Sequence, residues 1–213
     1  MTTSLAKRHV PTDPAILYFG TPVVLLSTRN RDGTANLAPV SSVCWLDRKA
    51  MLGVSRASQS WTNMRREREV VLAVPSADQV QAVDRLALVT GRTPVPEYKS
   101  ARGYRHAADK FSRAGLTPVP SDLVGAPRVD ECPVAMECTV DHMQDDPHRL
   151  PIVEVTVQRV HAHPDILVAG NPNRVDPDMW RPLITSFQQF YGLQPRPLHP
   201  SALATIDEEL YRD

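Results

Sequence analysis

An Asp-Gly dipeptide, Asp32-Gly33, constrains the fold more than any other feature of this sequence. It separates two runs rich in β-branched and aromatic residues, 15–28 and 34–45. Asp-Gly between two such runs is a strong signal of a tight β-hairpin turn. We therefore expect these runs to pair as antiparallel strands, whereas a parallel α/β sheet would alternate strands with helices throughout.

The rest of the chain carries further strand and helix patterns. Strands are predicted over 49–55, 69–74, 132–141, 151–162 and 166–168. Helical spacing and end signals predict helices over 55–68, 77–90, 103–114 (ending at Gly115) and 180–191. Six or seven strands with helices inserted between them predict a mostly β fold, a closed antiparallel barrel with helical decorations.

Composition excludes several classes of protein. The 213 residues carry a formal net charge of zero, so neither a nucleic-acid footprint nor an acidic tail is expected. The N-terminus has no apolar core of a signal peptide, and no run of about 18 apolar residues predicts a membrane span. Three cysteines without a CxxC motif fit a reducing cytoplasm rather than a disulfide framework. No GxGxxG motif supports a dinucleotide-binding fold.

The strand expected over 36–45 has an unusual sequence, NLAPVSSVCW. A strand built only for packing would alternate apolar and polar residues and would hold no proline. Pro39 removes one donor from the ladder and frees the neighbouring backbone for a ligand. The small side chains of Ala38 and Ser41 would let a flat ring come close. We interpret the segment from Asn36 to Ser42 as one wall of a site for a flat heteroaromatic group.

The next strand leads into a segment, VSRASQSWTN, with hydroxyl groups at the expected start of a helix. A helix N-terminus offers free N–H groups and a partial positive charge. Hydroxyls and the guanidinium of Arg56 would complete a pocket for a phosphate. Ordinary capping by one serine explains the same residues, so this segment alone leaves both interpretations open. Because only the turn at Asp47-Arg48 joins the two strands, both segments could line one groove.

Six segments follow one another along the chain: TPVVLLSTRNRDGTANLAPVSSVCWL, VSRASQSWTNM, DKFSRAGLTP, the strands VAMECTV and PIVEVTVQRVHAHPDIL, and WRPLITSFQQFYGL. In this order they resemble the flavin reductase-like family, the FMN-binding split β-barrels. The resemblance covers roughly residues 12 to 195. Two segments depart from the family pattern. Ser58 and Gln59 stand where the family often has lysine and aspartate, and Ile152-Val153-Glu154-Val155 lacks the usual glycine.

The resemblance implies one split-barrel domain over 1–213, of antiparallel Greek-key type, with an N-terminal arm (1–12) and a C-terminal extension (171–213). It implies an FMN-binding oxidoreductase that moves a hydride from NAD(P)H to flavin N5. The reduced flavin would pass to a partner monooxygenase or act on a substrate in place. A homodimer is also implied.

The resemblance and the two segments together assign twelve cofactor-binding residues. Those expected on the ring and ribityl chain are Asn36, Ala38, Pro39, Val40, Ser41 and Ser42. Those expected on the phosphate are Ser55, Arg56, Ser58 and Ser60, and Lys110 and Phe111 are expected to cover the site or contact flavin. No catalytic acid–base pair is assigned.

Other interpretations compete with a reductase. The same barrel could hold FMN, haem or a deazaflavin as a carrier or sensor, or could be purely structural. His161 and His163, with Cys132 and Cys138 upstream, suggest zinc, but no compact four-ligand spacing exists, so no metal site is expected. Cys44 is expected to be a small buried hydrophobe rather than a reactive thiol.

Overall fold

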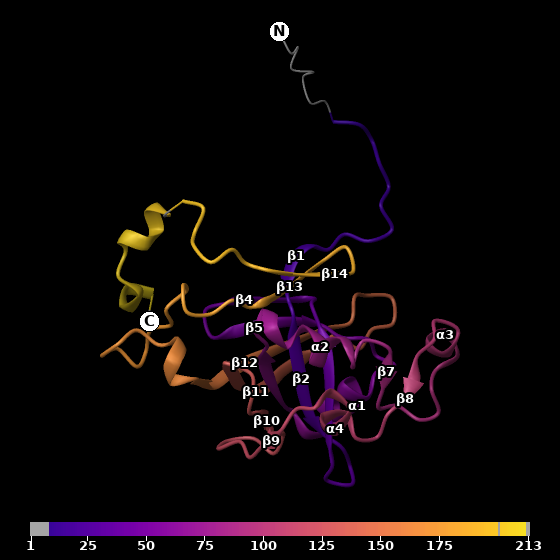
Figure 1. Cartoon of the computed structure of the whole chain (residues 1–213). Coiled ribbons are helices and arrows are strands. Elements are labelled where there is room, and N and C mark those ends of the chain that lie inside the picture. The colour runs from indigo at the N-terminus through magenta and orange to yellow at the C-terminus, as the bar shows by residue number, and fades with distance from the viewer. Residues whose placement is uncertain (1–8, 200, 212–213) are drawn as a thin grey trace.

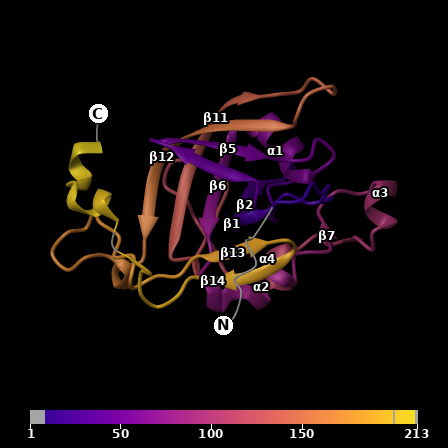
Figure 2. The same cartoon turned by 90° about the horizontal axis from the view of Figure 1, so that it is seen from above.

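A seven-stranded antiparallel sheet forms the body of the protein, and its strand order is β3-β2-β6-β11-β12-β5-β4. The computed structural model describes residues 9–199 and 201–211. The strands of this sheet are β2 (Val24–Arg29), β3 (Ala35–Val40), β4 (Val43–Leu46), β5 (Lys49–Gly53), β6 (Glu69–Val74), β11 (Val134–Met143) and β12 (Ile152–Ala162). The sheet curls around an apolar core (Figures 1 and 2). The mostly β antiparallel fold expected from the sequence is therefore confirmed.

The two edges of this sheet are neighbours in sequence. β3 and β4 lie at opposite ends of the strand order, yet only Ser41 and Ser42 separate them. Three residue steps, from Val40 to Val43, span about 11 Å at most, so the sheet has to curl until its edges meet at this point. The amide of Gly53 donates to the carbonyl of Ser42 at 2.7 Å, which ties β5 to the same junction. We call this junction the seam of the barrel.

Alternation along the strands fills two hydrophobic clusters. Val24 and Leu26 of β2 face the interior of the barrel together with Leu52, Leu72 and Val153. The intervening Leu25 faces the other side of the sheet, where the helices α2 (Val80–Asp84) and α4 (Lys110–Ala114) cover it. β2 is therefore buried on both faces, which explains its nearly continuous apolar sequence.

The remaining elements are short. They are β1 (Phe19–Pro22), α1 (Gln59–Glu67), β7 (Val89–Thr90), α3 (Glu97–Ser100), β8 (Arg105–His106), β9 (Pro118–Val119), β10 (Arg128–Val129), β13 (Leu183–Ser186), β14 (Gln189–Gly192) and the 3₁₀ turns η1 (Ala77–Gln79), η2 (Pro164–Ile166), η3 (Ala202–Thr205) and η4 (Glu208–Tyr211). β1, β13 and β14 form a separate antiparallel sheet, and β7 pairs with β8 in parallel. Gly115 ends α4 in the left-handed conformation, as predicted.

Several element boundaries predicted from the sequence are wrong. The run 15–28 forms two strands, β1 and β2, which pair in different sheets, and 34–45 divides into β3 and β4 at the seam. The predicted helix over 180–191 is the hairpin β13–β14, where β-branched Ile184 and Thr185 pair with aromatic residues across the strands. In place of a strand over 166–168, η2 buries Ile166. The predicted helix over 103–114 is helical from Lys110 onward.

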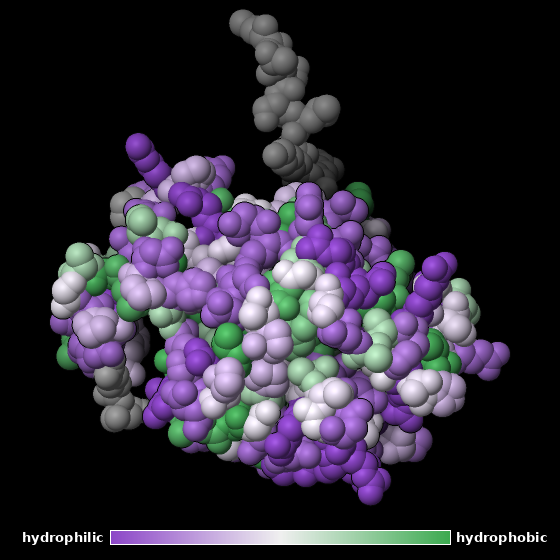
Figure 3. Space-filling view, turned by 60° about the horizontal axis from the view of Figure 1, so that its bottom comes forward, coloured by the Kyte–Doolittle hydropathy of each residue, from purple (hydrophilic) through white to green (hydrophobic). Residues whose placement is uncertain are grey.

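The C-terminal extension begins on the body of the protein, where Leu183 of β13 is 1% exposed in the core, and its end, from residue 193 onward, lies away from the barrel. Figure 3 shows an open gap between this extension and the body of the protein. Leu198, Leu203 and Leu210 of the extension are 88%, 66% and 78% exposed. Within the part of the chain that the structure describes, no helix has the length and apolar character needed to cross a lipid bilayer.

Candidate functional site

A cavity of about 560 Å³ opens at the seam of the barrel. Its volume is in the range typical of small-molecule sites. Its lining comes from β2 and β3 with the seam, from β5 and the start of α1, from the segment 86–104, and from α4. The lining residues are Tyr18, Leu26, Ala38, Pro39, Val40, Ser41, Ser42, Gly53, Val54, Ser55, Ser58, Gln59, Ser60, Leu86, Ala87, Val89, Thr90, Tyr98, Lys99, Arg102, Tyr104 and Lys110.

The start of α1 points hydrogen-bond donors toward this cavity. Ser58 is the N-cap, and its hydroxyl accepts the amide of Trp61 at 3.1 Å. The amides of Gln59 and Ser60 make no hydrogen bond within the residues described. No acidic side chain occupies the first turn. One serine thus caps the helix, as the simpler interpretation required, and two backbone donors at the positive end of the helix dipole are still available.

A buried polar network holds the start of α1 against β2 and β3. The amide nitrogen of Asn36 donates to the hydroxyls of Thr28 and Ser60, each at 3.1 Å. Asn63 likewise donates to Thr28 at 3.1 Å and accepts from Gln59 at 2.9 Å. Because the Ser60 oxygen accepts from Asn36, the Ser60 hydroxyl proton is free to be donated into the cavity.

The seam forms the opposite wall. β3 pairs with β2 on one side only, so Pro39 lies in an edge strand, where the ladder donor that it lacks is not needed. Tyr18 contacts Ser42 through their hydroxyl oxygens at 2.7 Å. A Cβ atom added to Gly53 would lie 2.7 Å from the Cβ atom of Ser42, so this wall requires glycine at position 53. The wall combines small side chains with unpaired edge-strand backbone.

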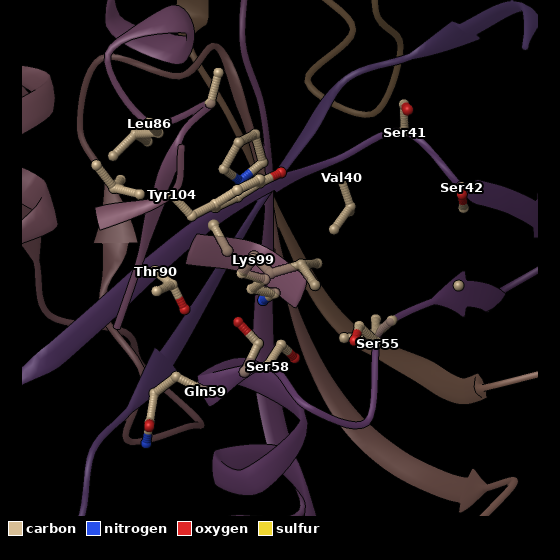
Figure 4. A pocket seen from close by; sticks show the side chains of 18 of the residues that line it. Val40, Ser41, Ser42, Ser55, Ser58, Gln59, Leu86, Thr90, Lys99 and Tyr104 are labelled. Atoms are coloured by element: carbon tan, nitrogen blue, oxygen red, sulfur yellow. The ribbon is translucent and has the colours of Figure 1, made fainter. Parts of the chain in front are cut away.

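A strap of residues 91–104 covers the cavity from the side of α3. The parallel pair β7–β8 closes the base of the strap, where Val89 lies opposite Arg105. Near its middle, the Tyr98 hydroxyl lies 3.2 Å from the hydroxyl of Ser55, just before α1. Figure 4 shows Ser58, Thr90 and Lys99 reaching the cavity from three different elements. The strap and the start of α1 therefore belong to one site.

Lys110 is the most unusual residue of the lining. It is 3% exposed, and it makes no hydrogen bond or ion pair within the described chain. Burial and the nearby Lys99 ammonium lower the pKa of Lys110 to about 8. The lining holds three cationic side chains, Lys99, Arg102 and Lys110, and no acidic one among the residues described. Its chemistry suits an anionic ligand.

Nine of the twelve predicted cofactor-binding residues line this cavity. They are Ala38, Pro39, Val40, Ser41, Ser42, Ser55, Ser58, Ser60 and Lys110. The other three lie elsewhere. Asn36 is buried beneath the cavity and orients Ser60. Phe111 packs in the cluster under α2 and α4. Arg56 turns away, and its Nη2 atom donates to the carbonyls of Gln144, Asp146 and Arg149 at 2.7, 2.6 and 3.0 Å.

The strap was missed by the sequence reasoning. Tyr98, Lys99, Arg102 and Tyr104 all line the cavity, and Thr90 lies at its base. The alternation of basic and aromatic residues in YKSARGY was the available signal. The predicted helix over 103–114 includes the end of that segment, and the assigned site residues do not include any part of it.

A second polar cluster lies on the far part of the sheet. Glu137 is fully buried and accepts the amides of Asp122, Leu123 and Val124 at 3.0, 2.6 and 3.2 Å. The Nε2 atom of His161 lies 2.6 Å from the Glu137 carboxylate. Asp122, Glu137 and His161 could together approach a cation, but every contact of Glu137 is explained by anchoring the loop at 122–124.

The histidines and cysteines do not converge on a common site. His163 contacts the carbonyl of Asp130 at 2.8 Å, whereas His161 contacts Glu137. Cys132 and Cys138 are buried, and burial raises the pKa of the Cys138 thiol to about 12. The expectation that Cys44 is buried is wrong, because β4 is an edge strand and this side chain points outward.

Comparison with known proteins identifies the family. A family model described as a flavin reductase like domain matches residues 16–177. A curated protein of Bacillus subtilis (strain 168), the uncharacterized protein YdfE, is 33% identical over 187 residues, which cover 88% of this chain and 90% of that protein. The match spans most of both chains.

Solved structures share the fold. Flavoredoxin of Desulfovibrio vulgaris (Miyazaki F) superposes with a TM-score of 0.72 at 21% identity, over 96% of this chain and 99% of its own. An FMN-binding domain of a flavin reductases-like enzyme from Shewanella baltica OS155 gives 0.64 at 18% identity, over 85% and 90%. Nitrilotriacetate monooxygenase component B from Bacillus cereus gives 0.66 at 17% identity, over 84% and 87%. This chain therefore belongs to the flavin reductase-like family of FMN-binding split β-barrels.

Proposed function

We propose that the protein is an FMN-dependent oxidoreductase whose cofactor binds in the cavity at the seam, with NADH or NADPH as the hydride donor. One observation carries this proposal. Backbone amides, hydroxyls and unpaired cations converge beside a flat wall of edge strand, within one cavity of about 560 Å³. A phosphate at one end and a planar ring at the other would satisfy both parts of this lining.

The donor set fits the phosphate of a flavin mononucleotide. The amides of Gln59 and Ser60 and the hydroxyl of Ser60 would donate to phosphate oxygens at the positive end of α1. The hydroxyl of Ser55 lies in the same part of the lining. Lys110 supports the fit independently, because a lysine buried without a partner loses hydration that an anionic ligand would replace.

The seam fits the ring. Ala38, Pro39 and Val40 offer small or apolar side chains along an edge strand whose outer side has no partner strand. Backbone groups of Ser41 and Ser42 follow directly, where polar atoms on one side of an isoalloxazine would find donors and acceptors. Such a wall can orient a flat ring without a catalytic acid or base.

The bound flavin would supply the redox chemistry, accepting a hydride from a reduced nicotinamide. The residues of this chain would bind the phosphate, hold the ring against the seam and exclude water from its covered face. We propose that the reduced flavin serves a partner monooxygenase or a substrate bound in place. The fold shared with a monooxygenase component B supports the first destination.

A two-step titration tests this function. Apo protein is titrated with FMN while flavin fluorescence is recorded, and NADH or NADPH is then added without oxygen. We expect saturable binding followed by bleaching of the flavin absorption band. FMN binding without bleaching by either nicotinamide would contradict a reductase and would support a flavin-binding or carrier protein. Absence of FMN binding would contradict the whole proposal.

We also propose that the protein is a homodimer. The exposed leucines at the end of the C-terminal extension, which lies away from the barrel, support this proposal, because apolar side chains of this kind are usually covered. Light scattering of the full chain after size-exclusion chromatography measures its mass. A monomer at micromolar concentration would contradict the dimer without affecting the cofactor assignment.

A further inference from the structure

The strap carries positive charge that the rest of the chain does not balance. Within residues 91–104 there are three lysines and arginines, Arg92, Lys99 and Arg102, against one acidic residue, Glu97. Lys99 and Arg102 make no ion pair or hydrogen bond through their side chains within the residues described. Elsewhere, cations such as Arg29 and Lys49 lie 2.8 Å from a carboxylate. The protein as a whole has a formal net charge of zero, whereas this segment has a net positive charge.

The unbalanced charge points inward. Lys99 is half-buried and lines the cavity that also contains Lys110, so two ammonium groups share one space without an anion between them. Like charges in a partly desolvated site repel each other. A bound anion with two negative charges would remove this repulsion, whereas a neutral ligand would leave it in place.

Aromatic contacts fix the cations over the cavity. The Lys99 ammonium lies 5.7 Å from the centre of the Tyr104 ring, and the Arg102 guanidinium lies 5.8 Å from that of Tyr98. Tyr98 in turn contacts Ser55 at the start of α1. Two tyrosines thus contact both cations within the lining of the cavity, and one of these tyrosines also contacts the segment that leads into α1.

The nearest alternative cation is engaged elsewhere. Arg56 lies between Ser55 and the N-cap of α1, but its guanidinium donates to three carbonyls and stacks 5.6 Å from the ring of Trp61. The start of α1 therefore has amides and hydroxyls but no cation of its own. The strap supplies charge to the same place from a distant part of the sequence.

We propose that Lys99, with Arg102 at the rim, makes the cavity selective for the phosphorylated flavin, FMN, over riboflavin. This inference rests on the proposed function and assigns its ligand specificity to the strap. A phosphate monoester carries close to two negative charges at neutral pH, and riboflavin has the same ring without them. The cations act on the phosphate alone, so they change the affinity for FMN and not that for riboflavin.

The test measures dissociation constants for FMN and riboflavin with the full-length protein. The variants are Lys99→Met, Arg102→Met and the double variant, and Arg105→Met is the control. Arg105 is exposed at the base of the strap and outside the cavity lining. We expect Lys99→Met to weaken FMN binding about tenfold or more and Arg102→Met to weaken it less, since hydrogen-bonded charge pairs are among the stronger contacts. Riboflavin affinity stays the same, which also shows that the variants are folded.

The outcomes separate the two proposals. If the double variant retains the wild-type ratio of FMN to riboflavin affinity, the strap does not select for the phosphate. The proposed function would still stand in that case, provided that the wild type binds FMN. An equal loss in Arg105→Met would also overturn the inference, because the effect would come from the general field of the protein. If the wild type binds neither flavin, the proposed function fails, and the inference fails with it.

Discussion

Two buried ionisable residues of this protein, Glu137 and Lys110, differ in their hydrogen-bond partners. Glu137 is fully buried and accepts three backbone amides and the His161 ring. Lys110 is 3% exposed and has no such partner within the described residues. A charge satisfied by its own chain stabilises architecture. A charge left without a partner is stable only because the rest of the fold tolerates it, which is common at ligand sites.

The pKa values follow the same contrast. Burial alone would raise the pKa of Glu137, but hydrogen bonds from Asp122, Leu123 and His161 outweigh it and hold this pKa below its ordinary value. Burial and Lys99 lower the pKa of Lys110 to about 8, and no contact opposes them. The carboxylate is therefore stabilised in its charged form, and the ammonium is destabilised in its charged form.

The largest effect is expected from Glu137→Gln, which tests the first half of this contrast. The amide cannot accept all the donors that the carboxylate accepts, so backbone N–H groups at 122–124 lose partners in the interior. We expect the free energy of unfolding to fall by about 4 kcal/mol, measured by urea denaturation. A loss below about 1 kcal/mol, the range of a surface pair, would show that the cluster is not structural.

Acid denaturation provides a second test of how Glu137 contributes to the free energy of unfolding. Because the folded-state pKa of Glu137 lies below its ordinary value of 4.5, the carboxylate stabilises the fold above that pH. Its contribution disappears as the pH falls through the folded-state pKa. The Gln variant should therefore lose less stability than the wild type over this acid range.

Lys110→Met is expected to act in the opposite direction. Methionine fills the same space without a charge, so the apo protein should gain about 3 kcal/mol at pH 7, the equivalent of a pKa lowered from 10.5 to about 8. Between pH 8 and 10.5 the unfolded state binds more protons, so wild-type stability rises with pH there, and the variant should lack this rise. Thermal unfolding across this pH range measures both effects.

FMN binding completes this test. The same variant should bind FMN more weakly than the wild type, because it has lost a cation of the cavity. Greater apo stability together with unchanged FMN affinity would show that Lys110 is a tolerated defect rather than a ligand group. A destabilised apo protein would contradict the contrast with Glu137.

The smallest effect is expected from Ser60→Ala, with Arg56→Met as its matched partner. Ser60 should contribute about 1 kcal/mol to FMN binding through one hydroxyl, a loss of five- to tenfold in affinity. Arg56→Met should leave FMN affinity unchanged and lower the stability of the protein, because its guanidinium holds the segment 144–149. Fluorescence titration and urea denaturation separate the two effects. Weaker FMN binding with unchanged stability in Arg56→Met would instead indicate that Arg56 binds the phosphate.

Local signals in the sequence were sufficient for much of the barrel and for one side of the site. Asp32-Gly33 predicted the β2–β3 hairpin, Pro39 predicted a missing ladder donor in the second strand, and the serines before Trp61 predicted a helix start with spare donors. Each of these features depends on neighbours within a few residues. The same is true of Gly115, which ends α4.

The remaining features depend on contacts between distant residues. Lys99 lines the same cavity as the start of α1 because β7 and β8 close a loop, and neither two-residue strand has a detectable sequence pattern. The direction of Arg56 depends on carbonyls about 90 residues later. The hairpin over 183–192 forms where β1 offers a partner strand, so helical spacing in that segment was misleading. In these cases, contacts between distant residues outweighed the local propensity of the sequence.

The strap leaves the barrel after β7 and returns at β8, which lies beside it. Its length and charge can therefore change by mutation, insertion or deletion without shifting the register of any strand in the large sheet. The seam has no such freedom, because two residues connect opposite edges of that sheet. Evolution could thus change the charge around the cavity while the barrel is inherited unchanged. The charge of the cavity and the architecture of the barrel are, in this molecule, separately evolvable traits.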